Sequence, residues 1–179
     1  MKKRGREPRG KYIRSLIFGF NDGTVSNLAL VAGLSGAMLG NKIVILGGLA
    51  DMIAGAISMG LGNYIATKSQ MEFYHRKYLK VNNMMEENPV SVGGMTFFAF
   101  LIAAFIPVLP FFFFPVQKAL LIASVTCMSL LFLIGVSKSR FTGHHWFKSG
   151  IEMVIVGAIA TLVSYYLGEV FNNYLARIL

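Results

Sequence analysis

Two acidic residues stand inside long stretches of the sequence that are otherwise uncharged. Asp22 is the only charged residue between positions 15 and 41, and Asp51 is the only one between positions 43 and 67. In a membrane helix, a carboxylate near the centre costs about 2.5–3.5 kcal/mol on insertion scales. Such a residue usually marks an ion or proton path, and the alternative is a buried polar group that fixes the fold. Asp22 and Asp51 are therefore the first candidates for chemistry.

Polar and sulfur-containing side chains accompany both acids. Asn21 and Asp22 belong to a patch that also contains Thr24, Ser26 and Asn27. At 100° per residue, one face of the following helix carries Asp51, Gly55, Ser58, Met59 and Gly62. The two helices run in opposite directions, so we expect Met59 at about the depth of Asp22. A carboxylate combined with a thioether favours a transition metal, since Mg²⁺ and Ca²⁺ prefer oxygen ligands alone.

Five apolar stretches are available to position these residues across a membrane. The chain has 179 residues, of which 55% are hydrophobic and only 14% are charged. Because about 20 apolar residues span the hydrocarbon core, we predict an all-α, polytopic membrane protein with five transmembrane helices. This excludes a soluble enzyme, a secreted disulfide scaffold and a disordered chain. The helices are expected at about 16–39, 43–67, 93–114, 117–136 and 150–170, which together form a domain over 16–179.

The basic residues orient the chain in the membrane. The net charge is +9, and all basic residues except Lys42, Lys118 and Arg177 fall in segments on one side of the five predicted helices. By the positive-inside rule, this side is cytoplasmic, so the basic segment 1–15 and the extension 68–88 lie in the cytoplasm. This placement of charge indicates a membrane protein and no nucleic-acid partner. The single cysteine, Cys127, lies inside an apolar stretch and excludes an internal disulfide.

Small residues recur at helical spacing in the first two predicted helices. Gly36 and Gly40 form a Gly-xxx-Gly pattern, and Gly55 and Gly62 lie on the face of the second helix that carries Asp51. Such residues let helix backbones approach closely, either within one chain or between two copies. One five-helix subunit offers few polar groups to enclose an ion path. We therefore predict a twofold homodimer in which the first two helices form the interface.

A second set of possible metal ligands lies in the cytoplasmic extension. Glu72 and His75 have the Glu-x-x-His spacing of carboxylate-bridged iron sites, and Glu86 and Glu87 follow near the end of the segment. A single copy of this motif on a solvated helix is also compatible with an ordinary surface. The two readings, metal capture and solvated surface, remain open from the sequence.

Two other function classes deserve comparison with an ion path. The Gly33-Leu34-Ser35-Gly36 segment has the Gly-x-Ser-Gly pattern of rhomboid-like intramembrane proteases. A nucleophilic serine needs a base within hydrogen-bond reach, and all three histidines (His75, His144 and His145) lie outside the predicted helices. A membrane scaffold without transport activity would explain the small residues but not the intramembrane acids. We therefore expect no enzyme activity.

Several motifs of the sequence resemble those of the vacuolar iron transporter family. The motifs are Asn21-Asp22-Gly23-Thr24-Val25-Ser26, then Ala54 to Tyr64, and Phe105-Ile106-Pro107-Val108-Leu109-Pro110. The resemblance implies a homodimer of five-helix subunits that exports Fe²⁺, and often Mn²⁺, from the cytosol in exchange for protons, with no permanently bound cofactor. It also implies that Asp22 and Met59 line the path at the dimer interface, and Asp51 stands where the family often has glutamate.

The sequence departs from this family in its cytoplasmic part. The plant members join the second and third helices by a long glutamate-rich domain, whereas this chain has only the short segment 68–88. The resemblance thus implies a short form without the long metal-binding domain. It also implies a multi-pass location in the lipid bilayer, in the cell membrane of a prokaryote or in the vacuolar membrane of a eukaryote.

Overall fold

The computed structural model describes residues 9–77, 88–143 and 145–178, and the regular structure in these segments is helical throughout. The prediction of an all-α protein is confirmed for this part of the chain. The helices are α1 (Arg9–Gly36), α2 (Asn41–Lys77), α3 (Pro89–Val108), the 3-10 helix η1 (Leu109–Phe112), α4 (Val116–Thr142) and α5 (Trp146–Ile178). Most of them run past the expected membrane stretches, because helix-forming residues continue beyond the apolar core.

Four helical segments within the described residues are long and apolar enough to cross a membrane. They are Asn41–Arg76, Pro89–Phe112, Val116–Arg140 and Trp146–Tyr174. Helix α1 is also long enough, with 28 residues, but polar residues interrupt its apolar run and it is not among the four. The polar patch around Asp22 therefore distinguishes α1 from the four segments that have a long apolar run.

Local sequence signals set the ends of several helices. The Asn88 side chain accepts a hydrogen bond from Val90 N (3.0 Å), and Pro89 occupies the first helical position, where its missing N–H costs nothing. Pro107 lies inside α3, and the helix changes to the 3-10 form at Leu109, two residues later. Gly143 ends α4 with a φ of 72°, a left-handed conformation that glycine adopts without strain.

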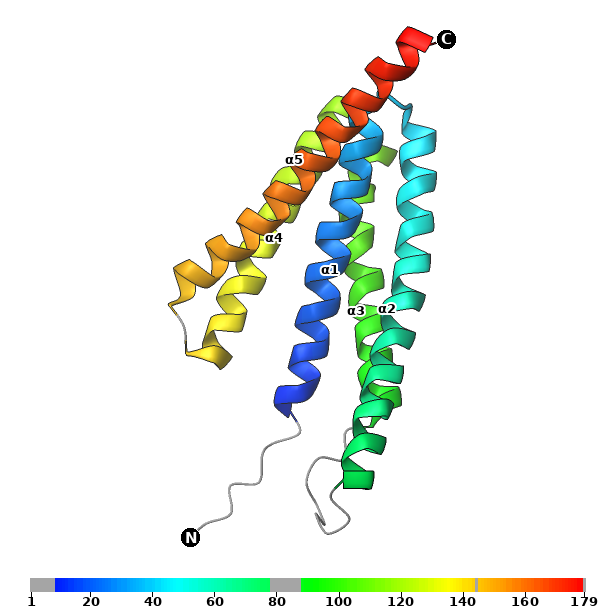
Figure 1. The fold of residues 1–179 in the computed structure, drawn as a ribbon. Helices are drawn as coiled ribbons and strands as arrows, with labels where there is room; N and C mark the ends of the chain where they lie inside the picture. The colour runs from blue at the N-terminus through cyan, green and yellow to red at the C-terminus, as the bar shows by residue number, and fades with distance from the viewer. Residues whose placement is uncertain (1–8, 78–87, 144, 179) are drawn as a thin grey trace.

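Helix α3 packs against both α1 and α2, and α1 lies between these helices and the α4–α5 pair (Figure 1). One core cluster joins Leu28 and Val31 of α1 to Val44 of α2, and it continues through α3 into α4 at Cys127. A smaller cluster consists of Ala56 of α2 with Phe100 and Ala104 of α3. Together, the two clusters fix the depth of α1 relative to α2, which matters for the acidic residues below.

Helices α4 and α5 form a hairpin, and the end of this hairpin that carries the α4–α5 connection lies away from α1 (Figure 1). At the other end, α5 crosses close to α1. A Cβ atom added to Gly36 would collide with Tyr165 O, and one added to Gly168 would collide with Gly33 O. Gly36 therefore permits close packing of α1 on α5 within the same chain.

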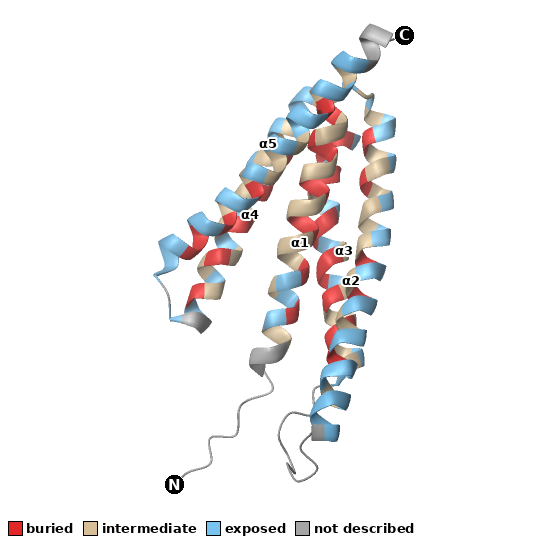
Figure 2. Cartoon of the chain, in the orientation of Figure 1, coloured by how far each residue is buried: buried red, intermediate tan, exposed pale blue. Residues whose placement is uncertain are grey.

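The buried residues lie on the inner faces of the helices, and much of the outer surface is apolar (Figure 2). Large hydrophobic side chains are exposed along α2 and α5, including Leu46 and Leu167, each 69% exposed. Extended apolar surface of this kind is unfavourable in water but suits the hydrocarbon core of a bilayer. The burial pattern thus agrees with a membrane environment for the bundle.

Candidate metal path

The polar patch of α1 is divided between the protein interior and a more accessible face. Thr24 and Asn27 are fully buried, whereas Asn21, Asp22 and Ser26 are half-buried. Thr24 Oγ1 donates to Phe20 O at 2.8 Å, which satisfies its hydroxyl within the helix. The structure therefore separates the patch into a fully buried part and a group of half-buried residues around Asp22.

Asn27 joins three helices through its side-chain amide. Its Nδ2 donates to Gly48 O of α2 at 2.9 Å and to Ala104 O of α3 at 2.7 Å. Both carbonyls belong to helix backbones, so the amide adds hydrogen bonds between helices that are already internally bonded. In an apolar environment such bonds fix the positions of the helices relative to one another.

The two candidate acids belong to the same part of the molecule. Asp22 of α1 and Asp51 of α2 are both half-buried. Gly23, next to Asp22, and Gly55, one turn after Asp51, both pack against Phe100 of α3. Among the described residues, neither carboxylate has an ion-pair partner, and Asp51 Oδ2 is buried without a hydrogen-bond partner. Two neighbouring negative groups without a cation inside a helical bundle form a site that favours positive charge.

The equal depth expected for Met59 and Asp22 stays a prediction. Gly23, next to Asp22, packs on the backbone of Phe100, and Gly60, next to Met59, packs against Phe97 of α3. Met59 is half-buried and contacts the cluster around Phe100.

The remaining residues of the predicted path have different environments. Gly55 packs on the ring of Phe100, where any larger side chain would collide, so it supports helix packing within the chain. Ser58 and Gly62 are exposed on α2, and an added Cβ at Gly62 or Gly40 would meet nothing within 4 Å. Gly36 and Gly55 thus pack inside one chain, while Gly40, Ser58 and Gly62 face outward.

The possible ligands in the cytoplasmic extension do not converge in the described part of the chain. Glu72 and His75 are both exposed near the end of α2, and His75 Nδ1 donates to Met71 O at 2.9 Å within the same helix. Glu86 and Glu87 lie outside the described residues. Where the structure describes the chain, there is no group of three or more His, Cys, Asp or Glu side chains that could hold a metal.

Ser35 has no part in a serine–histidine pair with the described histidines. Its Oγ donates to Val31 O at 2.6 Å and the residue is 8% exposed, near the end of α1 that adjoins α2. His75 lies at the opposite end of α2, and His145 lies beside the start of α5, where its ring stacks on Trp146. The Gly-x-Ser-Gly pattern is therefore explained by a satisfied serine between two close-packed glycines.

Sequence reasoning did not single out the two asparagines that the structure makes important. Besides Asn27, Asn63 of α2 donates through Nδ2 to Thr96 Oγ1 of α3 at 2.7 Å, and Thr96 Oγ1 donates to Val92 O. Asn63 stands one turn beyond Met59 on α2. The signal was available: an amide in an apolar helix must find partners on a neighbouring helix, as carboxylates must.

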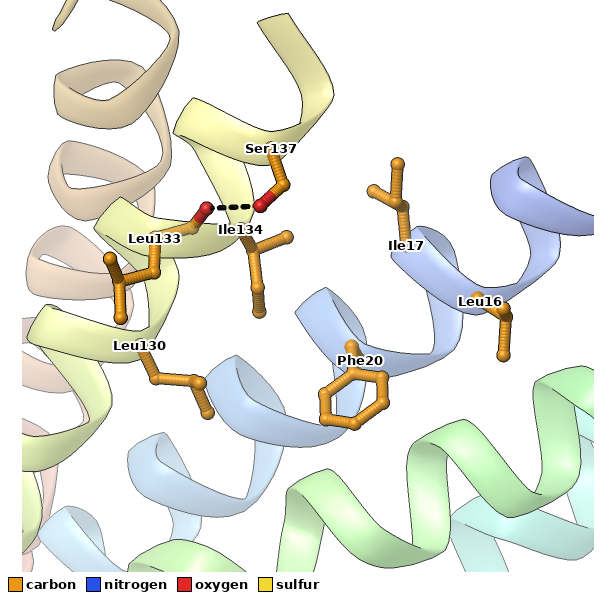
Figure 3. A pocket seen from close by; sticks show the side chains of 7 residues that line it. All are labelled: Leu16, Ile17, Phe20, Leu130, Leu133, Ile134 and Ser137. Atoms are coloured by element: carbon orange, nitrogen blue, oxygen red, sulfur yellow. Dashed lines mark hydrogen bonds between the residues drawn. The ribbon is translucent and has the colours of Figure 1, made fainter. Parts of the chain in front are cut away.

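An apolar crevice separates α1 from α4 on the other side of α1 (Figure 3). It has a volume of about 280 Å³ and is lined by Leu16, Ile17, Phe20, Leu130, Leu133, Ile134 and Ser137. Its single polar side chain, Ser137, already donates to Leu133 O at 2.9 Å. The crevice therefore offers no ligand to a metal ion and does not form part of the candidate path.

Comparison with known proteins agrees with the motifs. A model of the VIT family matches residues 13–82 and 76–169. "Vacuolar iron transporter 2" of Oryza sativa subsp. japonica is 28% identical over 92% of this chain and 89% of its own length. "Vacuolar iron transporter 1" of Arabidopsis thaliana is 30% identical over 92% of this chain and 88% of its own. "Protein CCC1" of Saccharomyces cerevisiae is 28% identical over 87% of this chain and 68% of its own.

The alignments also show a difference in length from these relatives. The two plant alignments each extend over 219 positions, more than the 179 residues of this chain, so the relatives contain additional residues. The two segments matched by the family model meet at residues 76–82, where α2 ends. This junction agrees with a short form that lacks the long domain between the second and third helices. With its family model matched over most of its length, the chain belongs to the VIT family.

Proposed function

We propose that this integral membrane protein transports a divalent transition metal, Fe²⁺ or Mn²⁺, out of the cytosol in exchange for protons. The observation that carries the proposal is the pair Asp22 and Asp51, two neighbouring carboxylates without an ion-pair partner among the described residues. Two uncompensated acids inside a helical bundle reduce stability, and a cation path gives them a function. The names of the relatives support iron as a cargo.

The proposed metal follows from the donors around the acids. Asp22 and Asp51 supply oxygen, and Met59 of α2 supplies a thioether sulfur. Oxygen ligands suit Mn²⁺ as well as Fe²⁺, whereas sulfur favours the softer metals of the transition series. Asn21 and Ser58 add an amide and a hydroxyl on the accessible sides of the two helices. We therefore propose selection of transition metals over Mg²⁺ and Ca²⁺.

Proton exchange is the simplest way to release the metal. A carboxylate binds a metal ion only in its deprotonated form, so binding of the metal and binding of a proton compete at the same oxygens. A more acidic compartment on the far side of the membrane would favour protonation and release. Asp22 is proposed as the exchanging group, and Asp51 as a relay for protons.

A dimer is proposed on the exposed face of α2. Ala54, Ser58 and Gly62 follow one another at four-residue spacing along this face, and all three are exposed in the single chain. A stripe of small residues permits close approach of a second helix in a membrane. In such a dimer, α1 would be the fifth membrane helix, with its polar patch sheltered by the partner, the N-terminus in the cytoplasm and the C-terminus outside. Glu72 and His75, on the cytoplasmic part of α2, are proposed to attract metal to the entrance.

Metal uptake into proteoliposomes tests the proposal. The purified chain is reconstituted into vesicles with an acidic interior, and uptake of Fe²⁺ or Mn²⁺ is followed with and without the pH gradient. We expect uptake that depends on the gradient, together with alkalinisation of the vesicle interior. Uptake without proton movement would contradict antiport, and the absence of uptake for either metal would favour the alternative of a non-transporting membrane scaffold.

A further inference from the structure

Three buried side-chain oxygens in the described structure have no hydrogen-bond partner. They are Ser26 Oγ, Asn27 Oδ1 and Asp51 Oδ2. Buried polar atoms are almost always hydrogen-bonded, because an unsatisfied one costs about 1–3 kcal/mol in protein interiors. Three such oxygens on two facing helices, α1 and α2, therefore require an explanation.

The orientation of the Asn27 amide is fixed by its partners. Nδ2 has two N–H donors, and both are used by the carbonyls of Gly48 and Ala104. Since each partner can only accept, the nitrogen must face them and Oδ1 cannot exchange places with it. Asn27 is completely buried, so Oδ1 remains an unpaired acceptor inside the protein.

The three oxygens lie at a similar level of the facing helices α1 and α2. Asn27 Oδ1 lies only 3.3 Å from the position that a Cβ atom on Gly48 would occupy, so it borders α2. Asp51 is three residues after Gly48, and residues at this spacing are neighbours on a helix surface, about 5–6 Å apart at Cβ. Ser26 adjoins Asn27 in the chain and lies one turn after Asp22. The group is therefore centred one turn further along α1 than Asp22.

We propose that Ser26 Oγ, Asn27 Oδ1 and Asp51 Oδ2 form an all-oxygen cation site next to Asp22, without the sulfur of Met59. The site would take a divalent cation of hard character, such as Mn²⁺, with water completing its coordination. The proposal rests on the proposed function, because a cation reaches this site along the path past Asp22. An amide oxygen, a hydroxyl and one carboxylate oxygen are hard ligands, and no sulfur accompanies them. A cation that enters from the cytoplasm would thus first meet the position with the Met59 sulfur, and then the position with oxygen ligands alone.

Binding of Mn²⁺ to the purified full-length protein in lipid nanodiscs tests this site without transport. Free Mn²⁺ gives a six-line paramagnetic resonance signal that weakens when the ion is bound, so a titration yields the stoichiometry and the dissociation constant. Ser26→Ala removes one of the three oxygens and leaves the helix intact. We expect it to raise the dissociation constant of one class of Mn²⁺ site by about 10-fold or more. Asp51→Asn should abolish that class.

Ser35→Ala is the matched control, because Ser35 is on the same helix but its hydroxyl already donates to Val31 O. It should leave Mn²⁺ binding unchanged. Unchanged binding in Ser26→Ala would overturn the site and indicate that the oxygens hold only water. Ser26→Ala decides the question even if Asp51→Asn does not fold.

Uptake measured on the same preparations separates this inference from the proposed function. Transport by a protein whose Mn²⁺ titration is insensitive to Ser26→Ala would refute the oxygen site alone. Mn²⁺ binding that responds to Ser26→Ala in a protein without transport would refute the transporter and retain the site.

Discussion

The side-chain amide of Asn27 donates to the carbonyl oxygen of Gly48 at 2.9 Å, and this bond holds α1 against α2 one turn from Asp51. The same amide reaches α3 at Ala104, so a single residue links all three helices that surround the acids. Packing and hydrogen bonding between the helices thus hold Asp51 in position relative to α1.

Asp22→Asn is expected to abolish transport while the protein still inserts and assembles. Asparagine keeps the shape of the side chain but loses the charge that binds both metal and proton. Uptake of Fe²⁺ and Mn²⁺ should fall at least about tenfold. A tenfold weaker binding of the metal corresponds to a loss of about 1.4 kcal/mol in binding free energy. Asp51→Asn should have an intermediate effect if this residue relays protons. Proton-coupled uptake that is unchanged in Asp22→Asn would exclude Asp22 as the exchanging group.

Met59→Leu is expected to impair Fe²⁺ transport more than Mn²⁺ transport. Leucine conserves volume and apolarity, so packing against the Phe100 cluster should survive, but the soft sulfur donor is lost. The measurement is the ratio of initial uptake rates for the two metals, taken under reducing conditions. Met52→Leu is the control, because Met52 contacts the same cluster but is not among the proposed ligands. Equal losses for both metals would argue against a ligand role for Met59.

The sequence predicted candidate residues for the path, but not the contacts around them. The cost of charge in a membrane points to Asp22 and Asp51 without any structure, and their role stays a prediction. The packing of Gly23 and Gly60 on α3 could not be predicted, because it depends on contacts between helices that are distant in sequence. The interhelical role of Asn27 was missed for the same reason: its partners lie 21 and 77 residues away.

Gly55→Ala is expected to destabilise the protein, whereas Gly94→Ala is not. A Cβ atom on Gly55 would collide with the ring of Phe100, so the ring or the helix must move, at a cost of about 1–3 kcal/mol. An added Cβ on Gly94 would meet nothing within 4 Å, and alanine favours the helical conformation. Thermal unfolding in detergent, detected by the aggregation of the unfolded protein, compares the two variants. Equal midpoint temperatures would show that α2 and α3 do not pack closely at Gly55.

Labelling of single cysteines is expected to place the two ends of the bundle on opposite sides of the membrane. In a Cys127→Ala background, cysteines replace the exposed residues Lys42 and Lys118 at one end and Glu72 and His145 at the other. An impermeant thiol reagent should reach positions 42 and 118 from outside the cell, and positions 72 and 145 only after the membrane is opened. External labelling of position 72 would contradict a cytoplasmic N-terminus and five crossings.

Ser58→Cys is expected to form a disulfide between two copies of the chain. Ser58 is exposed at the centre of the small-residue stripe on α2, so a twofold axis along this face would bring the two Ser58 positions together. In the Cys127→Ala background, mild oxidation in membranes should convert much of the protein to a covalent dimer. Ser129→Cys is the control, because Ser129 is exposed on α4, away from the proposed interface. Cross-linking through Ser129 in place of Ser58 would move the dimer interface to α4 and remove the model of a path shared between two copies of α2.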